Sequence, residues 1–295
     1  MGILLSCCGW RDDGAARIGA YMAPGAWMRY FAARPPEPEQ TCLAAEADLA
    51  DLALRGRLGL VVAIDYTSSN NRNGRVSFGG RPLHTIALVG AQRNPYEEVI
   101  GALRALHEVC GTPDGAVPPV IAFGFGDNFT SDERVFRFAP PPEPDCATVD
   151  DLLVRYREIT PEIVLSGPTS FAPALRRAAA LVEETQRPHA LVLIVDGAPM
   201  RWEQNVAALR DVSVLALYVV CVCVGDSAFT LVESMARTAA DECMFPNFSF
   251  VNFRELRYTD DGADRADWQV RTSAAVLAAV AAQAQEARAV GAKYG

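Results

Sequence analysis

The stretch that decides the fold is Val61-Val62-Ala63-Ile64-Asp65-Tyr66-Thr67-Ser68-Ser69-Asn70. It opens with an apolar run, which is typical of a strand buried on both faces. The run ends abruptly in the pattern Asp65-x-Thr67-x-Ser69, so the strand delivers one carboxylate and two hydroxyl groups to a single loop. Hard oxygen ligands packed so closely suit a hard cation such as Mg²⁺. The stretch therefore predicts a buried strand with a candidate metal site at its carboxyl end.

Two later segments add side chains of the same chemical kind. Ser166-Gly167-Pro168-Thr169-Ser170-Phe171 carries hydroxyl groups in a loop, and Leu193-Ile194-Val195-Asp196-Gly197 is an apolar strand that ends in a carboxylate. In open parallel sheets, ligands bind outside the carboxyl ends of the strands, so we expect Asp65 and Asp196 at that edge. Asp127 ends another apolar segment and is a candidate neighbouring acid. Taken singly, such carboxylates also fit solvated strand ends, and such hydroxyls also fit turn or helix caps.

Apolar strand-like segments alternate with segments of helical periodicity from Thr41 onward. Strands separated by helices favour a sheet covered on both faces, so the sequence predicts an α/β fold with a doubly wound, mainly parallel sheet flanked by helices. The C-terminal helix is expected on the surface, because its alanines are interspersed with Gln283, Gln285, Glu286 and Arg288. The expected strands are 58–65, 117–126, 135–138, 190–196, 213–225 and 248–253, and the expected helices are 41–57, 95–109, 149–158, one that ends at 184, 203–210, 229–240 and 267–289.

Composition narrows the class of protein. The chain has 295 residues, of which 50% are hydrophobic and 21% are charged, as in an ordinary folded protein. A formal net charge of −9 and the lack of a basic stripe argue against nucleic-acid binding. The eight cysteines include no Cys-x-x-Cys pair, and no zinc pattern emerges. No secretory signal or membrane-spanning run is visible, so we expect reduced thiols in the cytosol.

The N-terminus matches a lipidation signal of the kind that directs proteins to membranes. Met1-Gly2-Ile3-Leu4-Leu5-Ser6 matches the N-myristoylation pattern, and Cys7 and Cys8 follow as palmitoylation sites. A single myristoyl chain binds membranes only marginally, so the double cysteine is the natural second anchor. We therefore expect lipidation at Gly2, Cys7 and Cys8, which would place the protein at the cytoplasmic face of a membrane with a cytosolic pool. Residues 1–40 are expected to form an acylated tail and a Pro-rich linker.

A series of short strings, ordered along the chain, resembles one known family. From about Thr41 to Tyr294 the sequence resembles the copine-type von Willebrand factor A domain, most of all the version in plant RING-domain ubiquitin ligases. Members of that ligase group resemble this chain in having an acylatable Gly2. The matching strings are 64–70 (IDYTSSN), 74–78 (GRVSF), 94–97 (NPYE), 123–127 (FGFGD), 156–159 (YREI), 166–173 (SGPTSFAP), 196–197 (DG), 224–226 (VGD) and 248–253 (FSFVNF).

The resemblance implies a metal-ion-dependent adhesion site on a von Willebrand factor A or Rossmann-like domain that spans residues 41–295. Mg²⁺ is the expected cation, with Mn²⁺ and Ca²⁺ as alternatives. A site with two carboxylates and three neutral hydroxyls leaves the cation electrophilic and one position open. A carboxylate from a protein partner can then complete the coordination shell. The implied ligands are Asp65, Thr67, Ser69, Thr169 and Asp196.

The function predicted from these features is that of a divalent-cation-dependent protein-binding adaptor, tethered to a membrane by N-terminal lipidation. An alternative is a RING-less component of a ubiquitin-ligase pathway, because the sequence shows no Cys/His framework after Cys243. A metal-free scaffold is a third possibility. No nucleophile elbow, phosphate loop or Cys/His pair emerges, so no enzymatic activity of its own is expected. His84, His107 and His189 are expected to be structural or solvated.

Overall fold

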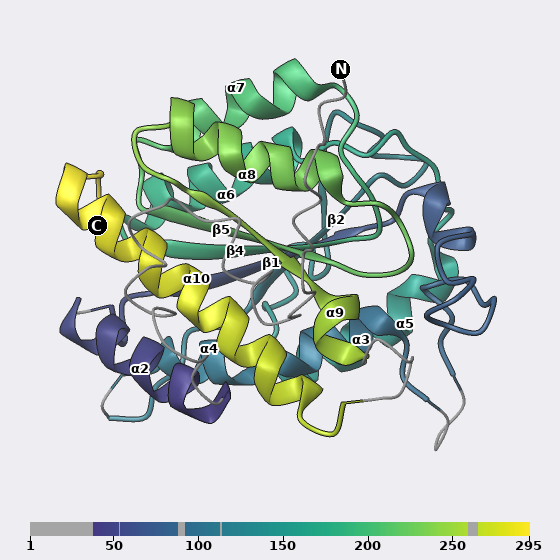
Figure 1. Ribbon diagram of the computed structural model, residues 1–295, viewed down its shortest axis with the longest axis horizontal. Coiled ribbons are helices and arrows are strands. Elements are labelled where there is room, and N and C mark those ends of the chain that lie inside the picture. The colour runs from purple at the N-terminus through teal and green to yellow at the C-terminus, as the bar shows by residue number, and fades with distance from the viewer. Residues whose placement is uncertain (1–37, 53, 88–91, 113, 259–264) are drawn as a thin grey trace, which may run out of the picture.

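The computed structural model describes residues 38–52, 54–87, 92–112, 114–258 and 265–295. A central sheet lies between two layers of helices, as Figure 1 shows. Helices α6, α7 and α8 cover one face, and α2, α3, α4, α5 and α10 cover the other. The helices are α2 (Pro38–Asp51), α3 (Pro95–Ala102), α4 (Arg104–Val109), α5 (Val149–Ile159), α6 (Ala172–Thr185), α7 (Trp202–Val212), α8 (Thr230–Glu242), α9 (Phe253–Arg257) and α10 (Trp268–Val290).

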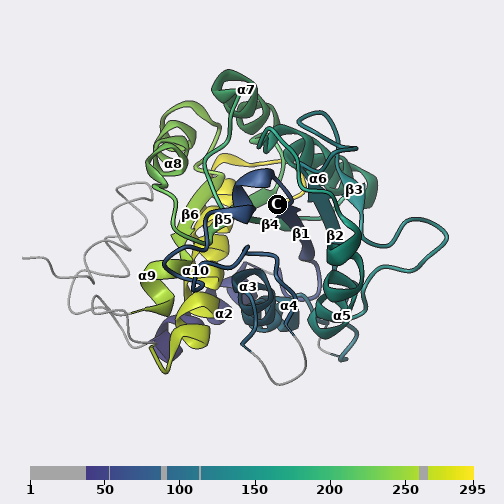
Figure 2. The ribbon, with the colours of Figure 1, turned by 90° about the vertical axis from the view of Figure 1, so that its right-hand side faces the viewer.

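The described strands form one sheet in the order β3-β2-β1-β4-β5-β6, and its central part can be followed in Figure 2. The short edge strand β3 is antiparallel to β2, and all other neighbouring pairs are parallel. The predicted doubly wound, mainly parallel sheet is therefore confirmed. The strands are β1 (Gly59–Asp65), β2 (Ile121–Phe125), β3 (Phe136–Arg137), β4 (His189–Val195), β5 (Leu217–Cys223) and β6 (Phe248–Asn252).

Alternation along the central strands divides the apolar core into two halves. In β1, Val62 and Ile64 point to the layer of α3 and α10, whereas Val61 and Ala63 point to the layer of α6 to α8. Every residue of β1, β4 and β5 is buried, as a parallel sheet covered on both faces requires. The sheet is therefore a rigid platform for the loops at its carboxyl edge.

Several expected boundaries shift. Helix α2 begins at Pro38 rather than Thr41, because proline is compatible with the first turn of a helix. The expected helix 95–109 is two helices, α3 and α4, which meet at Leu103. The expected strands 117–126 and 213–225 are shorter, as β2 and β5. For α2, β2 and β5 the middle of the element was predicted correctly, whereas the break at Leu103 in the middle of 95–109 was not predicted.

The expectation that α10 is a surface helix holds near its C-terminal end, where Gln285 and Arg288 are exposed, and is wrong for the middle of the helix. Most of its residues are buried, and α10 packs between α2 and the sheet. Gln283 is 1% exposed; its side-chain amide exchanges hydrogen bonds of 2.9 Å with the backbone N–H and C=O of Val219 and donates to Ser249 at 2.7 Å. A polar residue is buried here because every hydrogen-bonding group of its amide that faces the protein has a partner.

In the described part of the chain, no helix combines the length and apolarity needed to cross a bilayer. The proposed lipidation sites Gly2, Cys7 and Cys8 lie outside the described residues.

Candidate metal centre

The carboxyl ends of β1 and β4 bring the predicted ligands together. The two strands are parallel neighbours, and Ile64 of β1 lies opposite Ile194 of β4. Asp65 is the last residue of β1, and Asp196 directly follows β4, so both reach the same edge of the sheet. The two strands thus bring together two acidic residues that are 131 positions apart in sequence, as 196 minus 65 gives.

The three predicted hydroxyl ligands lie in the same cluster. Thr169 Oγ1 is 3.3 Å from Thr67 Oγ1, which is 3.0 Å from Ser69 Oγ. Ser69 Oγ donates a hydrogen bond of 2.8 Å to Asp196 Oδ1. Asp65 Oδ1 accepts a hydrogen bond of 2.8 Å from the backbone N–H of Thr67. All five predicted residues therefore contribute oxygen atoms to one continuous cluster.

Asp65 and Asp196 are buried acids without a cationic side chain as partner among the described residues. Both are 0% exposed. Burial, together with the negative charge of Asp196, raises the pKa of Asp65 well above its usual range. Burial also raises the pKa of Asp196, to about 6. Two ionised carboxylates in such surroundings need a compensating positive charge.

The oxygen cluster fits a divalent cation. Oδ2 of Asp65 is buried and has no hydrogen-bond partner within the described residues, so one carboxylate oxygen is left for a ligand. Carboxylate and hydroxyl oxygens are the donors that Mg²⁺, Mn²⁺ and Ca²⁺ accept. The described residues contain no group of three or more His, Cys, Asp or Glu side chains that could hold a metal ion. The candidate site therefore depends on hydroxyl groups as much as on acids.

A short 3-10 helix, η2 (Ser68–Asn71), fixes the loop that carries Thr67 and Ser69. The Asn70 side chain is buried and donates to the backbone oxygens of Asp65 and Thr67. Gly126, from the neighbouring strand end, lies so close that a Cβ there would be 2.4 Å from Thr67 Cγ2. Because its φ is also +81°, Gly126 is the residue that gives Thr67 its space.

Asn205 holds the loop with Thr169 from the neighbouring helix α7. Its Oδ1 accepts hydrogen bonds from the backbone N–H groups of Phe171 (2.7 Å) and Ala172 (2.9 Å), at the start of α6. Its Nδ2 donates to the carbonyl oxygens of Met200 and Arg201. Helix α6 therefore receives its cap from α7, which no local sequence pattern could indicate.

Asn73 is a site residue that sequence reasoning missed. Its Nδ2 donates hydrogen bonds to Asp196 Oδ2 at 2.9 Å and to Ser227 Oγ at 2.7 Å. The Asp226 carboxylate accepts from the backbone N–H groups of Val76 and Ser77, which holds the same loop in place. The sequence indicated only a polar, Gly-rich loop here, because these partners are between 123 and 154 residues away.

Asp127 is a turn cap rather than a further acid of the oxygen cluster. Its Oδ1 accepts hydrogen bonds from the backbone N–H and the hydroxyl of Thr130, and its Oδ2 accepts from the N–H of Phe129. These local capping hydrogen bonds account for the position of the Asp127 side chain.

The fold and the oxygen cluster define the class of protein. A doubly wound sheet with Asp-x-Thr-x-Ser after its central strand and a second acid after the adjacent strand is a von Willebrand factor A type domain. The copine family model matches residues 82–292, and the chain belongs to the copine family. That match begins after Ser69, so it bears on the family and does not cover the Asp-x-Thr-x-Ser segment.

Two kinds of curated relative are similar in sequence. The E3 ubiquitin-protein ligase RGLG1 of Arabidopsis thaliana is 34% identical over 240 residues, which are 74% of this chain and 47% of that protein. RGLG3 of the same plant is 36% identical over 67% of this chain and 55% of that protein. Copine family protein 2 of Caenorhabditis elegans is 35% identical over 70% of this chain and 3% of that protein. The chain thus spans about half or less of these relatives.

Solved structures show a more distant similarity. A manganese-loaded TRAP protein of Plasmodium vivax is 12% identical, with a TM-score of 0.46 over 68% of this chain and 71% of that one. The proximal thread matrix protein 1 of mussel byssus, with a zinc-occupied MIDAS motif, is 16% identical, with a TM-score of 0.42 over 76% of this chain and 46% of that one.

Proposed function

We propose that this chain is a divalent-cation-dependent protein-binding domain. The observation that carries the proposal is the buried cluster of five side chains in which Oδ2 of Asp65 has no described hydrogen-bond partner. Asp65 and Asp196 would supply negative charge, and Thr67, Ser69 and Thr169 would supply neutral oxygens. When bound, the cation would offer a partner carboxylate an electrophilic position beside the sheet.

Mg²⁺ is the first candidate among divalent cations. The five side chains offer two carboxylates and three hydroxyls, and Mg²⁺ commonly keeps several waters when proteins supply few charged ligands. Mn²⁺ accepts similar oxygen donors, whereas Ca²⁺ takes 6–8 oxygen ligands, typically at longer distances. The test therefore compares the binding affinities of Mg²⁺, Mn²⁺ and Ca²⁺.

The experiment is isothermal titration of Mg²⁺, Mn²⁺ and Ca²⁺ into the full chain. Asp65→Asn keeps the shape of the side chain and removes its charge. For each ion that the wild-type chain binds, we expect the affinity to fall by at least about 100-fold. Asp127→Asn is the matched control, because Asp127 ends a neighbouring strand and caps a turn outside the cluster. Equal binding by wild type and Asp65→Asn, or no binding by wild type, would contradict the proposal.

Attachment to a membrane is the second part of the proposal. It is supported by the sequence pattern at Gly2, Cys7 and Cys8 and by the weak binding that one acyl chain provides. We expect Gly2→Ala to abolish incorporation of an alkyne-labelled myristate and to move the protein to the soluble fraction of cells. Replacement of both cysteines by serine should leave myristate in place and weaken membrane retention. Unchanged fractionation of Gly2→Ala would refute the anchor.

A role in ubiquitination is the alternative, because the Arabidopsis relatives are named as E3 ubiquitin-protein ligases. The chain covers about half of those proteins. In this alternative, the domain acts as a component of a ubiquitin-ligase pathway. Purified chain added to a ligase reaction with E1, E2 and ubiquitin tests this role. Stimulated transfer to a third protein would support it, whereas an unchanged rate at all concentrations would count against it.

A further inference from the structure

The main-chain carbonyl of Asp65 receives hydrogen bonds from several buried side chains. His84 Nε2 lies 2.8 Å from this oxygen, Asn70 Nδ2 lies 3.2 Å away and the Tyr96 hydroxyl lies 3.3 Å away. Asn70 Nδ2 also donates to Thr67 at 3.0 Å, and the Tyr96 hydroxyl lies only 2.7 Å from Asn70 Oδ1. Asn70 has one amide hydrogen for each of its two acceptors, whereas the single Tyr96 hydrogen lies closer to Asn70 Oδ1. His84 therefore provides the shortest hydrogen bond to the Asp65 carbonyl.

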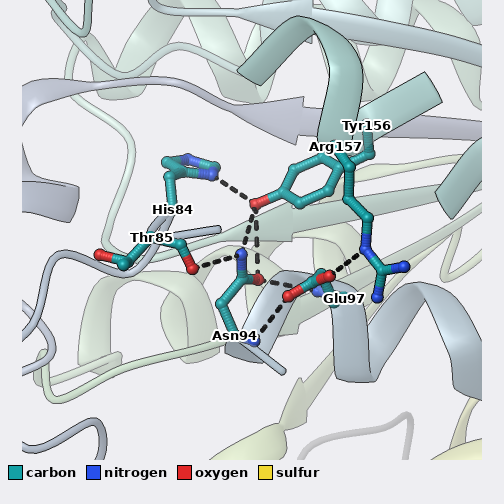
Figure 3. Close-up of polar contacts among 6 residues, drawn as sticks. All are labelled: His84, Thr85, Asn94, Glu97, Tyr156 and Arg157. Atoms are coloured by element: carbon teal, nitrogen blue, oxygen red, sulfur yellow. Dashed lines mark hydrogen bonds and ion pairs between the residues drawn. The ribbon is translucent and has the colours of Figure 1, made fainter. Parts of the chain in front are cut away.

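His84 belongs to a chain of polar contacts that runs to the protein surface, and Figure 3 shows this chain. His84 Nδ1 lies 2.8 Å from the Tyr156 hydroxyl, which lies 3.2 Å from Asn94 Nδ2. Asn94 caps helix α3 by exchanging hydrogen bonds of 2.9 and 2.8 Å with Glu97. Glu97 in turn forms an ion pair of 2.5 Å with Arg157, whose side chain is 42% exposed.

The direction of each hydrogen bond in this chain follows from its end groups together with the distances between the atoms. A carbonyl oxygen only accepts, so His84 Nε2 must carry a hydrogen to bind Asp65. Asn94 Nδ2 donates to the Tyr156 oxygen, while Asn94 Oδ1 accepts from the backbone N–H of Glu97. The Tyr156 hydroxyl lies 2.8 Å from His84 Nδ1 and 3.4 Å from Asn94 Oδ1, so its hydrogen points to His84 Nδ1, the nearer acceptor. All these atoms are satisfied when His84 is neutral and protonated at Nε2.

Aromatic packing holds the His84 ring in the plane that this hydrogen bond needs. Tyr66 stacks on one side at 4.6 Å between ring centroids, and Tyr96 stacks on the other at 4.1 Å. Both tyrosines are 0% exposed. The imidazole is thus stacked between two rings in a residue that is only 7% exposed.

We propose that His84 is a positioning residue of the metal centre: as the neutral Nε2–H tautomer it fixes the Asp65 main chain and thereby aims the Asp65 carboxylate. The inference rests on the proposed cation site. It goes beyond that site because His84 is no ligand and lies 19 positions away in sequence, where no Asp-x-Thr-x-Ser pattern includes it. The chain of polar contacts explains why a histidine suits this position. One ring nitrogen donates to the Asp65 carbonyl, and the other accepts from the Tyr156 hydroxyl.

The tautomer is tested directly by NMR of the full chain at pH 7 with ¹⁵N-labelled histidine. The protein has only three histidines, so the imidazole of His84 is assigned by its loss in His84→Phe. We expect a two-bond ¹⁵N–¹H spectrum with a protonated Nε2 and an unprotonated Nδ1. A protonated Nδ1, two protonated nitrogens or an average of both tautomers would overturn the assignment. This readout needs no metal, so it stands even if wild type binds none.

Positioning is tested by magnesium titration of matched variants. His84→Phe keeps a planar ring between Tyr66 and Tyr96 but removes both hydrogen bonds, and we expect Mg²⁺ affinity to fall by about 10-fold or more. His84→Gln retains an amide donor and should recover part of that loss. His107→Phe is the control, because His107 is also buried and bonded through Nε2 to a carbonyl, that of Pro118.

The pattern across the variants separates positioning from general destabilisation. Melting temperatures are measured alongside, and His107→Phe should lose stability without losing Mg²⁺ affinity. Wild-type affinity in a folded His84→Phe, or equal loss in His84→Phe and His107→Phe, would refute the positioning role. If wild type binds no divalent cation while the Nε2–H tautomer is observed, the proposed cation site fails and the hydrogen-bond assignment survives.

Discussion

Asp65 and Asp196 define the chemistry of this protein at the scale of single residues. Each is fully buried at a strand end, and the described residues place no cationic side chain beside them. The pKa of each carboxyl is raised chiefly by burial, to about 6 for Asp196. The cation-free site consequently favours a bound proton, whereas cation binding requires both groups to be ionised.

Cation affinity should therefore fall as the pH falls. At pH 8 Asp196 is ionised, and below about pH 6 protons compete, so we expect the Mg²⁺ affinity to drop roughly tenfold per pH unit for each competing proton. Titration calorimetry at pH 8, 7, 6 and 5.5 measures this. Repetition at pH 6 in buffers of different ionisation enthalpy should reveal proton release on binding. A constant affinity from pH 8 to 5.5 would show that these carboxyls do not bind the cation.

Contacts between elements decide where the loops of the site lie. Helix α6 has no side-chain cap of its own, and Asn205 of α7 supplies it from a position 0% exposed to solvent. The same amide holds the carbonyls of Met200 and Arg201. One side chain thus ties the Thr169 loop to the loop that follows Asp196.

Asn205→Ala should destabilise the protein by about 3 kcal/mol. Two buried backbone N–H groups and two carbonyls lose their partner, and one unsatisfied buried group costs about 1–3 kcal/mol. Urea unfolding followed by circular dichroism measures the free energy. Asn205→Asp keeps the acceptor but places a buried carboxylate oxygen against the Met200 and Arg201 carbonyls, so it should not restore the lost stability. Asn128→Ala, in an exposed part of a loop, serves as control and should change stability by less than about 0.5 kcal/mol.

At the scale of the whole molecule, burial of neutral histidine couples folding to pH. His189 begins β4, is 0% exposed and bonds through Nδ1 to the carbonyl of Arg187 at 3.0 Å. Burial lowers its pKa to about 4 from an ordinary value of 6.5. As the pH falls below 6.5 the unfolded chain gains a proton that the folded state resists, so folding stability decreases until about pH 4.

His189→Phe should therefore lose less stability on acidification than wild type. The difference between the two proteins in unfolding free energy should change by up to about 3 kcal/mol between pH 7 and pH 4, since one pKa unit corresponds to about 1.4 kcal/mol. Asp65 and Asp196 titrate in both proteins, so their opposite contribution cancels in the comparison. Urea unfolding at pH 7, 5.5 and 4.5 measures the effect. Parallel stability curves would exclude His189 as its source.

The sequence by itself determined the fold class, the order of the main elements and the five candidate ligands. The fold class and the order of elements follow from local signals, namely apolar runs that end in Asp65 and Asp196 and helical periodicity. The set of five ligands came from the resemblance to a known family, which the short ordered strings carry. The boundaries of β2 and β5 and the break at Leu103 depend on which residues find hydrogen-bond partners, so they were predicted less well.

Only the tertiary structure decided what surrounds those ligands. Asn73 reaches Asp196, Asn205 caps α6, His84 reaches the Asp65 carbonyl, and Gln283 is buried against β5. Each contact joins residues between 19 and 123 positions apart. The local sequence around one residue therefore does not predict its partner. A side chain's neighbours across a parallel sheet are set by strand order and register. Those exist only once the chain has folded.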